Sequence, residues 1–147
     1  MTDLKTRCYL VLSVIGVFLG IGAGITFTIY ENNLAVLWAF ISSAYALMNA
    51  LLNILHCTDK LDEYYSINVL YSINCFAFCS AAVFTAILAW YIFNICYYFF
   101  PILPIKDSYA IIAVWIFMSA KWASMLVGTT YRYIRILSNS GRPLSQI

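Results

Sequence analysis

The feature that most constrains this chain is a long apolar stretch from Ser108 to Thr130 with one lysine near its middle. A helix needs about 20 predominantly apolar residues to cross the hydrocarbon core of a bilayer, so this stretch is long enough to span a membrane. An ammonium group at mid-depth costs about 3 kcal/mol on insertion scales. Lys121 therefore needs a counter-charge, a water-filled path or a snorkelling route to the headgroups.

Three further apolar stretches divide the chain into four expected spans. The chain is 64% hydrophobic and only 10% charged, whereas soluble domains contain about 25% charged residues. We therefore expect a single all-α membrane domain over residues 1–147, an antiparallel bundle of four transmembrane helices. The expected spans are residues 8–30, 34–57, 71–97 and 108–130, followed by a basic tail over residues 131–147.

Lysines and arginines are divided unevenly between the two sides of this expected bundle. The side that holds both termini and the middle loop contains Lys5, Arg7, Lys60, Arg132, Arg135 and Arg142. The other side contains only Lys106. Because cytoplasmic segments carry an excess of Lys and Arg, both termini are predicted to be cytoplasmic.

The second span gathers its polar side chains on one face. At about 100° per residue, Trp38, Ser42, Tyr45, Asn49 and His56 fall within about 40° of one line along a helix. Polar groups in a membrane helix face the bundle interior or a cavity. Interhelical hydrogen bonds would account for the serine and the asparagine. His56 is the only histidine of the chain, and it is either structural, solvated or a ligand for a metal such as haem iron.

The first span has a series of glycines at four-residue intervals, Gly16, Gly20 and Gly24. Small residues at this spacing let two helix backbones approach closely in a bilayer. We expect a helix-packing seam here, either within the subunit or between the subunits of a homo-oligomer.

The last span has an unusual Lys121-Trp122 pair within Val114–Ala123, and Tyr131-Arg132-Tyr133 follows it. This pattern resembles the last span of the haem-responsive-gene family of haem transporters, which are small four-span permeases with cytoplasmic termini. His56 stands where that family has a functional histidine or tyrosine, and Asp107-Ser108-Tyr109 before the last span is also similar. The family often has a second histidine near the outer loop, which this chain lacks, so an outer ligand would have to be a tyrosine.

The resemblance implies transport of haem from the extracellular or endolysosomal side into the cytoplasm, across the plasma membrane or an endosome–lysosome membrane. His56 would ligate the haem iron, Lys121 or Arg132 would pair with the propionates, and aromatic and amide side chains would line the passage. The expected haem-binding residues are His56, Tyr45, Asn49, Lys121, Tyr109, Tyr131, Arg132 and Tyr133.

A second interpretation is a small assembly subunit of a membrane complex, in which Lys121 pairs with an acid on a partner chain. None of the six carboxylates of this chain is expected at mid-membrane depth, which disfavours an ion pair within the chain. The same absence disfavours a proton-coupled exporter, which needs an intramembrane carboxylate. One histidine, no paired acids within a span and no nucleophile constellation give no indication of an enzyme. The chain has no feature of a nucleic-acid-binding protein.

Overall fold

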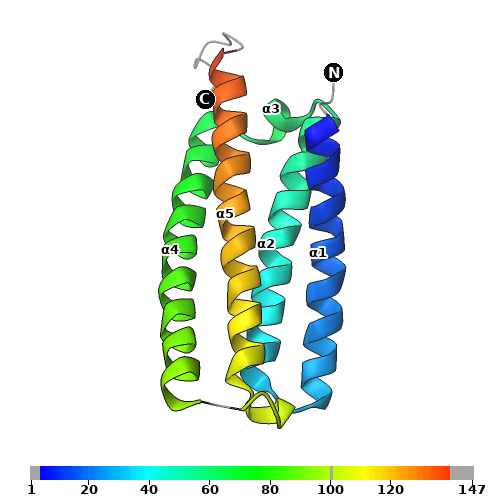
Figure 1. Cartoon of the computed structure of the whole chain (residues 1–147). Helices are drawn as coiled ribbons and strands as arrows, with labels where there is room; N and C mark the ends of the chain where they lie inside the picture. Colours follow the sequence, from blue (N-terminus) through cyan, green and yellow to red (C-terminus); the bar gives the residue numbers. More distant parts are fainter. Residues whose placement is uncertain (1–3, 100, 140–147) are drawn as a thin grey trace.

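The computed structural model describes residues 4–99 and 101–139, except for the side chain of Asp62, and these residues form a helical bundle (Figure 1). Four of its helices are long and apolar enough to cross a membrane, and the described residues contain no strand. The expected all-α, four-helix membrane fold is therefore confirmed. The elements are α1 (Leu4–Ile29), α2 (Asn33–Cys57), α3 (Leu61–Tyr64), α4 (Ile67–Tyr98), the 3-10 helix η1 (Ile105–Asp107) and α5 (Tyr109–Asn139).

The long helices extend beyond the apolar spans expected from the sequence. The first helix begins at Leu4 instead of residue 8, and α5 continues to Asn139, so the start of the expected tail is helical. The 31 residues of α5 correspond to about 46 Å of helix, whereas the hydrocarbon core is about 30 Å thick. Hydropathy marks only the part of a helix that lies in lipid, because backbone hydrogen bonding continues into the interfacial region. The extensions of α1 and α5 carry basic side chains onto one end of the bundle.

The helices lie in the spatial order α4, α5, α2, α1, with α2 and α5 in the centre (Figure 1). Half of the most apolar stretch of α2 is buried, against only 6% of that of α4. The outer face of α4 is therefore available to lipid or to a partner. The first helix begins at the same end of the bundle at which α5 finishes (Figure 1).

The glycines of α1 form a seam inside the subunit. A Cβ atom built on Gly16 would lie 2.2 Å from Cζ2 of Trp122 on α5, which is far inside van der Waals contact. A Cβ atom on Gly20 would lie 2.7 Å from Cβ of Ser43 and 2.9 Å from the backbone oxygen of Ala39 on α2. The absence of a side chain at these two positions is what allows α1 to approach the central helices.

The two connections at the other end of the bundle are tied together. Asn32 caps α2 by accepting a hydrogen bond from the backbone N–H of Ala35 (3.0 Å), and its Nδ2 donates to the carbonyl of Ile105 (2.8 Å). Next to it, Nζ of Lys106 lies 2.5 Å from Oε2 of Glu31. The hydrogen bond and the charge of Lys106 lower the pKa of Glu31, and Glu31 in turn raises the pKa of Lys106. These contacts join the α1–α2 turn to the segment that precedes α5.

Candidate functional site

The interface between α2 and α5 contains a line of buried hydrogen bonds. Asn49 donates from Nδ2 to the carbonyl of Trp122 (3.0 Å), and its Oδ1 accepts from Oγ1 of Thr129 (3.2 Å). Nearer the end of the bundle, the phenol of Tyr133 donates to Oδ1 of Asn53 (2.7 Å). The polar face of α2 therefore faces the bundle interior, as the sequence predicts, and part of it holds the central helices together.

Tyr45 points from α2 toward α4. Its phenol donates to Oγ of Ser80 (2.6 Å), and its ring lies between Phe76, with ring centres 6.2 Å apart, and Phe84, with ring centres 5.5 Å apart. These contacts bind α2 to α4 on the side opposite α1. Tyr45 is thus placed as a packing residue and does not lie beside the other candidate haem residues at the end of the bundle.

His56 lies in the last turn of α2 and packs against Tyr133 of α5. The two ring centres are 4.6 Å apart, and the ring planes are inclined by 33°. Tyr133 is almost completely buried, whereas the histidine is only half-buried. The imidazole is therefore held by Tyr133 on one side and stays partly exposed.

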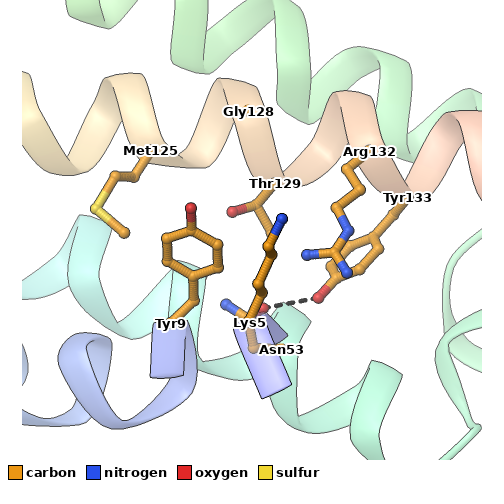
Figure 2. A pocket seen from close by; sticks show the side chains of 8 residues that line it. All are labelled: Lys5, Tyr9, Asn53, Met125, Gly128, Thr129, Arg132 and Tyr133. Atoms are coloured by element: carbon orange, nitrogen blue, oxygen red, sulfur yellow. Dashed lines mark hydrogen bonds between the residues drawn. The ribbon is translucent and has the colours of Figure 1, made fainter. Parts of the chain in front are cut away.

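A pocket of about 420 Å³ lies next to this ring pair, between α1, α2 and α5. It is lined by cations from two helices, Lys5 of α1 and Arg132 of α5, and by the hydroxyl groups of Tyr9 and Thr129. Figure 2 shows Lys5 and Tyr9 reaching from α1 toward α5, with the ammonium group of Lys5 between the side chains of Thr129 and Arg132. Tyr133 also lines this space, so the pocket and the His56 ring share one wall.

Arg132 joins the two helices on either side of the pocket. Its Nη2 donates to Oγ1 of Thr6 (3.1 Å), a residue of α1 that is completely buried. Gly128, one turn deeper, and Met125, two turns deeper, complete the lining on α5. A Cβ atom built on Gly128 would meet no other atom within 4 Å, so no neighbouring side chain fills this part of the pocket. The pocket is therefore polar and cationic at one side and uncharged at the other.

Lys121 lies four residues before Met125, on the same face of α5 and closer to the centre of the bundle. It is partly exposed, and its Nζ is 4.6 Å from the centre of the Trp122 ring. Among the described side chains, Lys121 makes no ion pair. The aromatic face stabilises the cation by about 0.5–2 kcal/mol, which is less than the cost of about 3 kcal/mol for a cation at mid-membrane.

The structure thus brings only some of the predicted haem residues together. Arg132 and Tyr133 line the pocket, and His56 packs against Tyr133 beside it. Tyr109 packs against Tyr91, with ring centres 5.5 Å apart, and begins α5 at the other end. Tyr131 has 65% of its surface exposed and lies outside the pocket. Asn49 of α2 and Lys121 of α5 lie deeper in the bundle and are not among the residues that line the pocket.

Two pocket residues on α1 were missing from the sequence prediction, Lys5 and Tyr9. Their spacing of four residues places both on one face of a helix, and the helix begins early enough to include both. This spacing can be seen in the sequence, but it places the two side chains on one face only if residues 4–8 are helical.

Comparison with family models, with curated proteins and with solved structures found no match for this chain.

Proposed function

We propose that this protein transports haem across a membrane, into the cytoplasm from the extracellular or endolysosomal side. The observation that supports this function best is the contact between His56 and Tyr133 beside a cationic pocket. Imidazole and phenol groups are common axial ligands of haem iron. The cations of the neighbouring pocket suit the two propionates of haem, because charges removed from water need partners of opposite charge.

In this proposal His56 binds the haem iron at the predicted cytoplasmic end of the bundle. Its ring is held on one side by Tyr133, which is itself fixed by the hydrogen bond to Asn53. The open side of the imidazole approaches the iron. A single histidine on a half-exposed helix end provides moderate ligation, and transport requires binding that is weak enough for release.

The cations have separate places along the path. Arg132 stands at the bundle end with the histidine, and Lys121 stands deeper in the same helix. Lys121 pairs with a propionate while haem crosses the middle of the bundle, and Arg132 takes over near the exit. The partly exposed position of Lys121 on the pocket-facing side of α5 supports this order.

The test is a titration of the purified protein in detergent with ferric haem, followed in the Soret band. We expect a saturable shift in the wild-type protein and at least tenfold weaker binding in His56→Ala. Tyr71→Phe serves as a control, because Tyr71 is an exposed aromatic residue on another helix, α4. The absence of a saturable shift in the wild-type protein would contradict the proposal. So would full haem uptake by both His56→Ala and Lys121→Ala at equal surface expression.

A second candidate function is that of an assembly subunit, and the position of Lys121 favours it. The only ion pair among the described side chains joins Glu31 and Lys106 at a bundle end, which leaves Lys121 without an acidic partner within those residues. A carboxylate from another membrane chain would provide one. Under this alternative, Lys121→Met dissociates a defined complex on native electrophoresis while leaving the isolated chain folded. Under haem transport, the same variant loses uptake without a change in complex size.

A further inference from the structure

We propose that the pocket between α1, α2 and α5 binds the phosphate headgroup of an anionic lipid drawn from the leaflet at that end of the bundle. The inference goes beyond haem transport and is independent of it, because it rests on the lining of the pocket and on its place in the bundle. His56 does not line the pocket and has no role in this binding.

The charge of the pocket indicates an anion. Lys5 and Arg132 belong to different helices and face the same space of about 420 Å³. The described residues that line this space include no carboxylate. Two cations that face one pocket from different helices attract an anion more strongly than either cation alone. The charge of the lining therefore favours a negatively charged ligand.

The hydrogen-bond donors of the pocket suit a phosphate group. Arg132 carries a planar fork of N–H groups, one of which donates to Thr6, and Lys5 carries three ammonium hydrogens. Tyr9 contributes a hydroxyl group to the lining, whereas the hydroxyl hydrogens of Thr129 and Tyr133 are already donated to Asn49 and Asn53. A phosphate group presents several strong acceptor oxygens and can use donors that approach from both helices at once. A lone carboxylate, with two oxygens, would leave part of this donor set without an acceptor.

The depth of the pocket indicates a lipid as the source of the phosphate. The apolar stretch of α5 finishes at Thr130, so Arg132 lies where the helix leaves the hydrocarbon core. Met125 and the open side of Gly128 continue the pocket inward from the cations without a charge. A phospholipid matches this arrangement of a charged outer part and an uncharged inner part. Its phosphate would lie at the cations, and its glycerol and acyl chains would point toward the membrane interior. Basic pockets between transmembrane helices on the cytoplasmic side are typical binding sites of anionic lipid headgroups.

A bound lipid would also join two helices that have few direct contacts. The main neighbour of α1 is α2, and α1 meets α5 through Gly16 against Trp122 and through Thr6 with Arg132. A phosphate held by Lys5 and Arg132 adds a bridge at the end of this interface. We therefore expect anionic lipid to raise the thermal stability of the bundle.

The experiment measures lipid binding by native mass spectrometry of the full chain in detergent, without haem. The probes are dioleoyl phosphatidic acid, dioleoyl phosphatidylcholine and, as a soluble phosphate ester, glycerol 3-phosphate. We expect saturable binding of one phosphatidic acid molecule at least tenfold tighter than that of phosphatidylcholine, and a higher melting temperature with phosphatidic acid. Lys5→Gln should weaken phosphatidic acid binding at least tenfold.

Lys60→Gln is the matched control, because Lys60 is exposed near the same end of the bundle and does not line the pocket. We expect it to change phosphatidic acid binding less than twofold. Equal losses in Lys5→Gln and Lys60→Gln would overturn the proposal, because they would indicate a diffuse basic surface. Equal binding of phosphatidic acid and phosphatidylcholine would also overturn it. Glycerol 3-phosphate binding as tight as that of phosphatidic acid would replace the lipid by a soluble phosphate ester and overturn the lipid assignment.

A melting curve of Lys5→Gln without added lipid keeps a folding defect separate from a binding defect. Because Lys5 is exposed, we expect this curve to match that of the wild-type protein. The haem titration uses His56→Ala and no phosphatidic acid, so either proposal can fail while the other stands.

Discussion

At the scale of single residues, Tyr133 connects more parts of the candidate site than any other side chain described above. It packs against His56, donates a hydrogen bond to Asn53 and forms one wall of the pocket. It is only 1% exposed. Interhelical hydrogen bonds in membrane proteins contribute about 0.6 kcal/mol on average and up to about 1.7 kcal/mol. Removing its hydroxyl group also leaves a buried amide oxygen without this donor.

We therefore expect Tyr133→Phe to lower the free energy of unfolding by about 1 kcal/mol, within the range measured for such bonds. Tyr131→Phe should change it by less than about 0.5 kcal/mol, the range of exposed substitutions, because Tyr131 is mostly exposed. The measurement is unfolding in mixed detergent micelles with increasing dodecyl sulfate, followed by circular dichroism. Equal effects of the two substitutions would show that the Tyr133–Asn53 bond does not stabilise the α2–α5 interface.

At the scale of elements, the close approach of α1 to the central helices depends on which glycines face them. Gly20 faces α2, where a Cβ atom would meet the backbone of Ala39 and the side chain of Ser43. Gly22 faces outward, and a Cβ atom there would meet nothing within 4 Å. Both positions are glycines on the same helix, so the same substitution changes helix propensity equally at each. A difference in stability between the two variants therefore reports on packing.

Gly20→Ala should destabilise the bundle by about 1–3 kcal/mol, the usual cost of overpacking, because the added methyl group pushes against rigid backbone. Gly22→Ala should be neutral or stabilising by up to about 1 kcal/mol, since alanine has the higher helix propensity. Thermal unfolding of both variants in the same detergent is the measurement. A loss of stability in Gly22→Ala equal to that in Gly20→Ala would argue against the α1–α2 seam.

At the scale of the whole molecule, the bundle has two chemically different ends. One end has the His56–Tyr133 contact and the cationic pocket with Lys5 and Arg132. At the other end the loops are tied by Asn32 to the carbonyl of Ile105 and by the Glu31–Lys106 ion pair. The excess of positive charge at the first end predicts that it faces the cytoplasm. Both proposed ligand sites would then open to the cytoplasmic leaflet.

This orientation can be measured by glycosylation mapping, because the chain contains no Asn-x-Ser or Asn-x-Thr sequence of its own. An acceptor sequence with flexible flanks inserted after Ile102 should be glycosylated in the lumen. The same insert after Asp59, in the loop at the pocket end, should stay unmodified. Modification after Asp59 and not after Ile102 would reverse the orientation and place the pocket on the outer side.

The sequence by itself determined that the chain forms an all-α membrane bundle of four apolar helices and that the polar face of α2 points inward. These properties follow from hydropathy, helical periodicity and local hydrogen bonding, all of which depend on residues that are close together in the sequence. Only the tertiary structure decided which helix each face meets. It turned Tyr45 toward Ser80 of α4 and brought Lys5 beside Arg132, which lies 127 positions later in the chain. The order of helices around the bundle depends on the packing of side chains such as Trp122 against Gly16. The polar face of one helix, seen in the sequence alone, does not show which other helix packs against it.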